Sequence, residues 1–285
     1  MNKLYLLLLT VGLSLASIKN YAQPDSIVLR DITWDKNSRA GMNELNIPSE
    51  GSQIAGLIYT ANGAQNHPTL IMLHGFPGNE RNLDIAQVAR ARGWNVIYFD
   101  YRGSWGSGGQ FSFANCVQDV VNVVAYCKKN AYMYRIDTSN IVLFGHSMGG
   151  WVCLKALQRL PGIKKGFALS TWNIGADFKK VKTESQFNAV VKQEGKYFVL
   201  NTSSEDIFRP VMAGLTYYDL QNDSTALSNK QIIMLDEHHN NKTLASAIQH
   251  NNKSYFEYSV WDTDHSFSNK RISLINKVLA FLKMK

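Results

Sequence analysis

The chain has 285 residues, of which 45% are hydrophobic and 11% aromatic, enough to form one sizeable core in a single α/β domain. Its formal net charge is +8 at pH 7. The Lys and Arg residues are not clustered with interleaved aromatic residues, so we interpret the charge as a solvated basic surface and exclude nucleic acid as a partner.

The first segment has the layout of a secretory signal peptide. Lys3 supplies a positive start, residues 4–16 are apolar, and a short polar stretch ends at Ala22. The apolar run is short for a membrane span, and the boundary has no Cys that could carry a lipid. We therefore expect residues 1–22 to be a signal peptide. Residues 23–285 should form a single secreted or periplasmic domain without a stable membrane anchor.

Apolar strand patterns alternate with helical patterns along the rest of the chain. They predict strands over residues 44–48, 54–60, 69–73, 95–101, 141–144, 166–171, 231–235 and 255–261. They predict helices over residues 79–92, 113–130, 151–160, 242–250 and 270–282. Such alternation is typical of an α/β fold with a mostly parallel sheet.

The connection between the strands at 166–171 and 231–235 is much longer than a usual crossover. It contains helical patterns over residues 177–191 and 203–218. We expect a helical lid over about residues 172–230 that sets substrate choice, with a peripheral decoration as the alternative.

The three cysteines, Cys116, Cys127 and Cys153, are predicted to be buried apolar residues. An odd number leaves at least one thiol unpaired in an exported protein. Cys116 and Cys127 fall on one predicted helix, roughly 16 Å apart at 1.5 Å per residue, which is too far for a disulfide.

Residues 145–149 read Gly-His-Ser-Met-Gly and fit the pattern G-x-S-x-G between a strand and a helix. The chain must turn sharply there with Ser147 in a strained conformation, and larger side chains at Gly145 or Gly149 would crowd the turn. The turn places the Ser147 hydroxyl at a helix N-terminus, where partial positive charge favours negative charge near the nucleophile.

This stretch resembles the nucleophile elbow of the α/β-hydrolase superfamily, and the resemblance covers nearly the whole chain after residue 50. The pattern is closest to serine esterases and to peptidases of the prolyl-oligopeptidase-like branch. It implies an eight-stranded, mostly parallel sheet flanked by helices, and a serine hydrolase that uses no cofactor.

Residues 74–78, His-Gly-Phe-Pro-Gly, resemble the oxyanion loop that follows the third strand in that superfamily. Such a loop must direct a backbone N–H at the developing oxyanion. Pro77 has no N–H, so Phe76 is the candidate donor, with the N–H of Met148 as the second. An ordinary strand-ending turn is the alternative.

The glycine-rich residues 102–109 lack the phosphate-binding pattern G-x-x-x-x-G-K-[ST]. They look like the superfamily loop that lines the rim of the active site. Trp105 is the candidate for an apolar wall of the substrate site, with simple packing on the loop as the alternative.

A serine nucleophile needs a base, and the base needs an orienting carboxylate. In α/β-hydrolases the chain order is serine, acid, histidine. His265 lies between the last strand and the closing helix, in a Thr-Asp-His-Ser-Phe sequence that resembles the family's histidine loop. We therefore predict His265 as the base.

Several acids compete for the orienting role, and the glycine that often precedes the family's acid is absent here. Asp236 directly follows the strand at 231–235 and is preferred, with Glu237 second and Asp262 or Asp264 as further alternatives. The neighbouring His238 and His239 could suggest a metal. Adjacent side chains of an extended segment face opposite ways, so no metal site is expected.

The sequence thus predicts a serine hydrolase with the triad Ser147, Asp236 and His265 that cleaves a small-molecule carboxylic ester through an acyl-enzyme. A peptide or amide substrate is the alternative. Peptidases of the prolyl-oligopeptidase type usually carry a large N-terminal propeller, for which this chain has no room. A binding protein that kept the fold and lost turnover is the remaining alternative.

Overall fold

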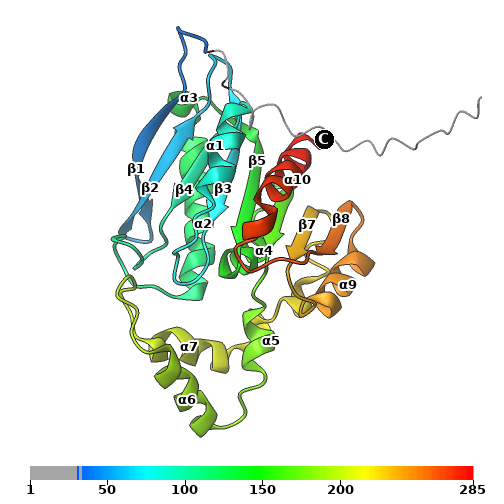
Figure 1. Cartoon of the computed structure of the whole chain (residues 1–285). Helices are drawn as coiled ribbons and strands as arrows, with labels where there is room; N and C mark the ends of the chain where they lie inside the picture. Colours follow the sequence, from blue (N-terminus) through cyan, green and yellow to red (C-terminus); the bar gives the residue numbers. More distant parts are fainter. Residues whose placement is uncertain (1–30, 32–33, 285) are drawn as a thin grey trace, which may run out of the picture.

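The computed structural model describes residue 31 and residues 34–284, and the predicted signal peptide lies outside this part. One sheet runs through the described chain with helices on both faces (Figure 1). Its strands are β1 (Gly41–Ser49), β2 (Ser52–Thr60), β3 (His67–Leu73), β4 (Asn95–Phe99), β5 (Ile136–His146), β6 (Lys165–Leu169), β7 (Gln231–Asp236) and β8 (Tyr255–Val260). The helices are α1 (Leu83–Ala91), α2 (Phe113–Lys129), α3 (Ala131–Tyr134), α4 (Met148–Arg159), α5 (Ile174–Phe178), α6 (Glu184–Glu194), α7 (Ser204–Ala213), α8 (Leu215–Tyr218), α9 (Lys242–Asn251) and α10 (Arg271–Lys283), with the 3-10 turns η2 (Leu220–Asp223) and η3 (Ser268–Lys270).

The strands lie in the order β1-β2-β4-β3-β5-β6-β7-β8. The pairs β1–β2 and β2–β4 are antiparallel, and the pairs from β4–β3 to β7–β8 are parallel. Parallel strands end at the same edge of a sheet, and ligands of open α/β sheets bind outside these ends. The predicted site residues all lie at the carboxyl end of β7 or in the segments that follow β3, β4, β5 and β8.

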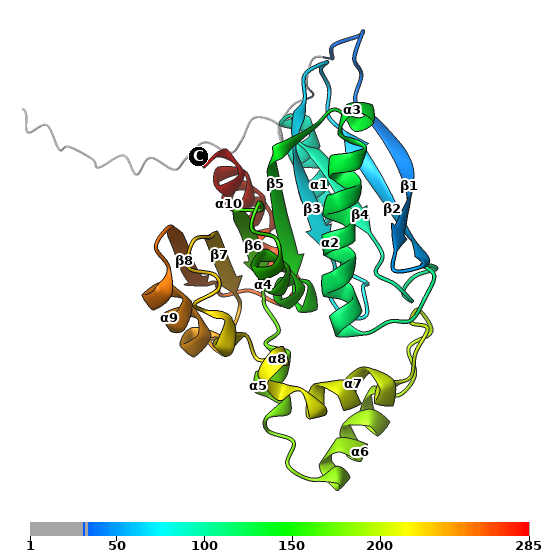
Figure 2. The same cartoon turned by 180° about the vertical axis from the view of Figure 1, so that it is seen from behind.

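Both faces of the sheet are covered, which explains why its central strands are apolar along most of their length. Consecutive residues of β5 enter opposite cores: Val142 and Phe144 pack on one face, and Ile141 and Leu143 on the other. Helices α1 and α10 cover the first face, and α2, α4 and α9 cover the second (Figure 2). The sheet is therefore a rigid platform for the segments at its carboxyl edge.

Residues 170–230, between β6 and β7, form a helical insert that contains α5, α6, α7, α8 and η2. The insert lies beyond the carboxyl ends of the parallel strands (Figure 1). Its end is fixed to α4, because the indole N–H of Trp151 donates to the carbonyl of Tyr218 at 2.9 Å, and the ammonium of Lys155 donates to Asp223 at 2.9 Å. Helices thus occupy the predicted insertion, and their action as a lid stays a prediction.

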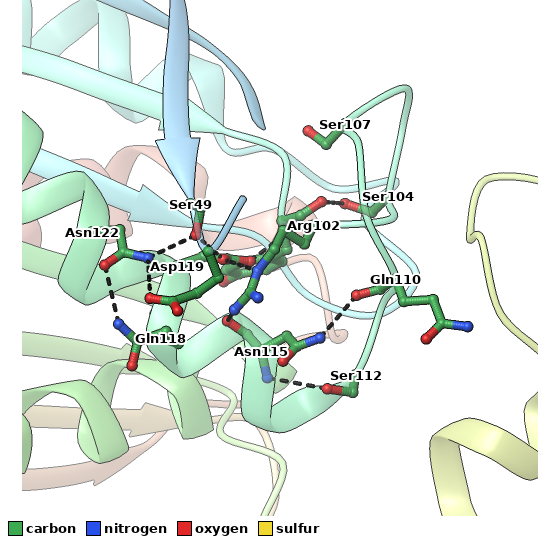
Figure 3. Close-up of polar contacts among 12 residues, drawn as sticks. Ser49, Arg102, Ser104, Ser107, Gln110, Ser112, Asn115, Gln118, Asp119 and Asn122 are labelled. Carbon is green, nitrogen blue, oxygen red and sulfur yellow. Dashed lines mark hydrogen bonds and ion pairs between the residues drawn. The ribbon is translucent and has the colours of Figure 1, made fainter. Parts of the chain in front are cut away.

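The rim loop, residues 100–112, follows β4 and is fixed to the body of the protein by a buried ion pair (Figure 3). Asp119 of α2 accepts hydrogen bonds from Arg102 through Nε at 2.5 Å and through the backbone N–H at 2.8 Å. The hydroxyl of Ser49 donates to the same carboxylate at 2.6 Å. These bonds compensate the burial of a charge that would otherwise be costly in the interior.

The rim loop in turn holds the insert. The N–H of Trp105 donates to the carbonyl of Val199 at 2.8 Å, and the N–H of Asn201 donates to the carbonyl of Gly103 at 2.7 Å. These backbone bonds form a short antiparallel bridge between two segments far apart in sequence. The position of the insert therefore depends on the rim loop.

Outside the insert, the predicted elements agree in type and order with the observed ones, and β5 begins earlier than predicted, at Ile136. Within the insert, the predicted helix over residues 177–191 is wrong, because the non-helical residues 179–183 separate α5 from α6, and the predicted helix over residues 203–218 is divided into α7 and α8 at Gly214. Cys116, Cys127 and Cys153 are free and buried, as expected. Each helix in the described part of the chain is too short or too polar to cross a membrane.

Candidate active site

Ser147 lies at the tight turn between β5 and α4. Its backbone has φ 59° and ψ −120°, a conformation that L-residues rarely adopt. A Cβ atom on Gly145 would lie 1.9 Å from the carbonyl oxygen of Gly149, and one on Gly149 would lie 2.0 Å from that of Leu73. Both positions therefore require glycine, as the sequence predicts, and the turn presents Ser147 at the start of α4.

The loop that follows β3 lies against Ser147. A Cβ atom on Gly75 would be 3.7 Å from the hydroxyl oxygen of Ser147. Phe76 comes next, and its ring packs edge-on against Tyr197 of the insert with 4.7 Å between ring centroids. Met148 begins α4, so its N–H has no acceptor within the helix. The two predicted oxyanion donors thus come from segments that adjoin Ser147.

Three side chains from three strand ends converge near this turn: Ser170 after β6, Glu237 after β7 and His265 after β8. Nδ1 of His265 lies 2.8 Å from Oε1 of Glu237 and 2.8 Å from the hydroxyl oxygen of Ser170. The Ser170 hydroxyl donates to Oε2 of Glu237 at 2.6 Å. An ionised carboxylate only accepts, so Nδ1 carries the proton, and Nε2 of the neutral ring is the nitrogen that can accept one.

Asp236, the preferred acid in the sequence analysis, points elsewhere. It is fully buried, and its carboxylate accepts from the N–H of Thr171 at 3.1 Å and from the amide of Asn241 at 3.0 Å. Consecutive residues of a strand point to opposite sides, so Glu237 is the residue that faces His265. The predicted pairing of Asp236 with His265 is therefore wrong, and the second candidate, Glu237, makes that contact.

The pKa values of these groups are shifted from their ordinary values in different directions. Burial opposes ionisation of Glu237, but hydrogen bonds from His265 and Ser170 outweigh it and lower the pKa of Glu237 to about 2. The hydrogen bond to Glu237 raises the pKa of His265 above its ordinary value, although burial acts against this. Burial instead raises the pKa of Asp236 to about 6. Glu237 is thus the carboxylate that stays ionised beside the imidazole.

The backbone of His265 is also held in place. Nε2 of His146 donates to the carbonyl oxygen of His265 at 2.9 Å, and the two rings lie 4.8 Å apart between centroids. The amide of Asn82 lies 3.3 Å from Nδ1 of His146 and fits a donor to that nitrogen. Arg271 of α10 donates to the side-chain oxygen of Asn82 at 3.1 Å and to the carbonyl of Ser266 at 3.0 Å. This network ties the histidine loop to the turn at Ser147.

A pocket of about 450 Å³ opens beside these groups. Ser147, Ser170, Glu237 and His265 all line it. Its other lining residues, mostly polar and in part from the insert, are Thr171, Trp172, Asn173, Ala176, Asp177, Lys180, His238, Asn240 and Asn241. A hydroxyl, an imidazole and a carboxylate therefore meet at a cavity large enough for a small ligand.

Trp105 lies outside the set of residues that line this pocket. Its indole N–H donates to the carbonyl of Pro77 at 2.8 Å, and the guanidinium of Arg81 lies 4.9 Å from its ring. Trp105 thus packs on the loop after β3, and a direct role in substrate binding stays a prediction. Within residues 34–284, no three His, Cys, Asp or Glu side chains are grouped to hold a metal ion.

Sequence reasoning missed Ser170 and His146. Ser170 carries a weak positional signal, because it directly follows a predicted strand whose neighbours both lead into the site. The partnership of His146 with the His265 backbone has no sequence signal, since the two residues are 119 positions apart.

The strand order, the turn at Ser147 and the loops that converge on it define the α/β-hydrolase superfamily. The BD-FAE family model matches residues 57–253, and the chain belongs to this family. The esterase Pf2001 of Pyrococcus furiosus has the same fold, with a TM-score of 0.63 and 20% identity over 89% of this chain and 94% of that one. A puromycin-hydrolyzing peptidase of Mycobacterium tuberculosis also shares it, with a TM-score of 0.63 and 15% identity over 86% of this chain and 39% of that one.

A curated relative adds a sequence match. The lysophosphatidylserine lipase ABHD12 of Rattus norvegicus is 30% identical over 100 residues, which is 34% of this chain. The match spans about a quarter of that relative, 24% of its length. Together these findings make the protein an α/β-hydrolase.

Proposed function

We propose that the protein is a serine hydrolase that cleaves carboxylic esters through an acyl-enzyme. The observation that carries this proposal is the 2.8 Å contact between Glu237 and Nδ1 of His265, in a pocket that Ser147 also lines. An ionised acid that orients a histidine beside an elbow serine is the arrangement that nucleophilic acyl transfer requires.

In the proposed reaction, Nε2 of His265 takes the proton from the Ser147 hydroxyl as the oxygen attacks the acyl carbonyl. The N–H groups of Phe76 and Met148 stabilise the oxyanion of the tetrahedral intermediate. The imidazolium, stabilised by Glu237, then protonates the departing alkoxide, and the acyl group remains on Ser147. Water attacks this ester with His265 again as base, which releases the carboxylic acid and restores the serine.

Esters are favoured over peptide bonds because an alkoxide leaves more readily than an amide nitrogen. The similar solved structures include an esterase and a peptidase, so peptides form the second arm of the test. The insert supplies part of the pocket wall, and we expect it to act as a lid that limits which acyl or alcohol group enters.

The test is labelling with a fluorophosphonate probe together with a screen of p-nitrophenyl esters and aminoacyl-nitroanilides. Wild type should be labelled and should hydrolyse at least one ester, and Ser147→Ala should lose both properties. Ser139→Ala is the matched control, because Ser139 is an exposed serine near the amino end of β5, away from the carboxyl ends of the strands. An unlabelled wild type that turns over no substrate would favour a non-catalytic binding protein, and faster hydrolysis of nitroanilides would favour a peptidase.

We also propose a secreted or periplasmic location, which the pattern of residues 1–22 supports. Mass spectrometry of the protein from fractionated cells should find a mature chain that begins near Gln23 outside the cytoplasm. Full-length protein with Met1 in the cytosolic fraction alone would contradict this proposal.

A further inference from the structure

We propose that Ser170 is a positioning residue of this site, whose hydroxyl holds Glu237 and His265 in the geometry needed for proton transfer. The inference rests on the proposed function, and it concerns a residue outside the serine, acid and histidine already assigned. Ser170 acts through its two neighbours and contacts no reacting atom in the proposed reaction.

Both oxygens of Glu237 are held by different partners. Oε1 lies 2.8 Å from Nδ1 of His265, and Oε2 accepts from the Ser170 hydroxyl at 2.6 Å. The hydroxyl oxygen also lies 2.8 Å from Nδ1, so its lone pairs face the proton that this nitrogen carries. Ser170 thus closes a triangle in which the Nδ1 proton is shared between a carboxylate and a hydroxyl oxygen.

A glutamate in this position needs such a support. Its side chain has one more rotatable bond than an aspartate, so holding it in one rotamer costs more conformational entropy. The aspartate at the end of β7, Asp236, is engaged by Thr171 and Asn241 instead. The Ser170 hydroxyl fixes the free end of the longer acid and so fixes the ring of His265.

The backbone of Ser170 is strained in a way that serves this contact. Its φ is 46°, in the left-handed region that L-residues other than Asn and Asp rarely occupy. Its N–H donates to the carbonyl of Leu235 at 2.7 Å, which extends the β6–β7 pairing by one residue before the chain turns. The turn places the hydroxyl beside Glu237, at a position where glycine would have less backbone strain.

Ser170 is not a second nucleophile in this arrangement. Its residue surface is only 1% exposed, whereas Ser147 is partly open to the pocket. The hydroxyl proton is directed at a carboxylate, and the nearby imidazole nitrogen, Nδ1, already carries a proton. Ser170 therefore lacks a nitrogen that could take its proton, and Ser147 remains the proposed nucleophile.

Two variants separate positioning from folding. Ser170→Ala removes the hydroxyl and keeps the backbone strain, and Ser170→Gly removes both. We expect both variants to lose about tenfold to a hundredfold in kcat, the range for a lost hydrogen bond to a charged group, with KM within about twofold of wild type. Ser170→Gly should be the more stable of the two. Ser259→Ala is the matched control, since its hydroxyl lies on β8 and has no partner among the described residues.

A double-mutant cycle tests whether Ser170 acts through the acid. In the Glu237→Gln background, adding Ser170→Ala should lower kcat by less than about a further threefold, because the carboxylate that Ser170 positions is already absent. A full, multiplicative loss in that background would overturn the inference, as would a kcat within twofold of wild type in Ser170→Ala.

Proton NMR of the full-length protein labelled with ¹⁵N-histidine provides a readout independent of turnover. We expect a far-downfield Nδ1–H signal, assigned by its loss in His265→Gln, that shifts in Ser170→Ala and Ser170→Gly and stays in place in Ser259→Ala. An unshifted signal, or none in wild type, would overturn the inference. If wild type hydrolyses no ester, the proposed function fails, and the NMR result still decides the role of Ser170. If the probe labels Ser147→Ala but not Ser170→Ala, Ser170 is the nucleophile and both proposals are overturned.

Discussion

The side chain of His146 donates from Nε2 to the carbonyl oxygen of His265 at 2.9 Å. His146 is the neighbour of Ser147 in sequence, so one hydrogen bond connects the turn that carries the predicted nucleophile with the loop that carries the predicted base. Burial lowers the pKa of His146 to about 4, and the neutral ring can donate from Nε2 while Nδ1 accepts from Asn82. The spacing of the two predicted catalytic groups therefore depends on an uncharged, buried histidine.

We predict that His146→Leu lowers kcat about tenfold to a hundredfold, because a small displacement of the base is costly when the reacting groups must be aligned. The free energy of unfolding should fall by about 1–3 kcal/mol, since the carbonyl of His265 and the amide of Asn82 lose their partner. Kinetics and urea unfolding measure the two effects. His250→Leu, on the exposed face of α9, is the control, and an active, equally stable His146→Leu would contradict the role of this bond.

The neighbouring acids Asp236 and Glu237 should respond differently to the loss of their charge. Glu237→Gln should lower kcat by about 10³- to 10⁴-fold, because an amide favours the wrong tautomer of His265. Asp236→Asn should keep kcat within about tenfold and lower the free energy of unfolding by about 1–3 kcal/mol, since its new NH₂ group would face the donor of either Thr171 or Asn241. The reverse pattern of activities would show that Asp236 is the acid that orients His265.

The contrast between these two acids shows how far the sequence alone can predict this site. The two glycines of the turn point to Ser147 as the candidate nucleophile, because only glycine tolerates the backbone contacts at 145 and 149. Topology points to His265 as the candidate base, because β8 ends at the same edge of the sheet as β5. The choice between Asp236 and Glu237 depends on the residue at which β7 ends, and a shift of one residue reverses the direction of the side chain. The contact of Ser170 depends on a left-handed backbone, which a serine residue does not predict.

We predict that kcat/KM rises with pH through a pKa above about 6.5, the usual value for histidine. The base acts only in its neutral form, and the hydrogen bond to ionised Glu237 raises the pKa of His265. Glu237 itself, with a pKa of about 2, should add no step in the neutral range. In Glu237→Gln the acid limb of the residual activity should move to lower pH. The control is Glu257→Gln, which removes an acid on β8 that pairs with Lys277 of α10 and should leave the acid limb in place. An acid limb below pH 6 in wild type would contradict this prediction.

The buried ion pair of Arg102 and Asp119 should be a structural requirement. Asp119→Ala leaves a buried guanidinium without its partner, and we expect the free energy of unfolding to fall by about 3–5 kcal/mol. Because the rim loop holds residues 199–201, the insert should also become more sensitive to limited proteolysis. Glu184→Gln breaks an exposed pair with Arg209 and should have little effect on either measurement. Equal stability and proteolysis of Asp119→Ala and wild type would contradict this prediction.

A second buried histidine should make the free energy of unfolding depend on pH. His74, in the loop after β3, is fully buried, and burial lowers its pKa to about 4. In the unfolded chain it takes up a proton near pH 6.5, so between pH 6.5 and 4 the unfolded state binds more protons and stability falls as the pH falls. The loss should reach about 3 kcal/mol at most, at about 1.4 kcal/mol for each pH unit between the two pKa values.

The test compares wild type with His74→Phe, whose ring can pack against Tyr98 and Tyr101. Wild-type stability alone is not decisive, because the pKa of Asp236 is raised to about 6, and this acid favours the folded state as the pH falls. The difference in free energy of unfolding between His74→Phe and wild type, measured in urea, should therefore grow in favour of the variant from pH 7 to pH 4.5. The exposed His250→Gln should show no such trend, and a constant difference for His74→Phe would mean that His74 is protonated equally in the folded and unfolded states.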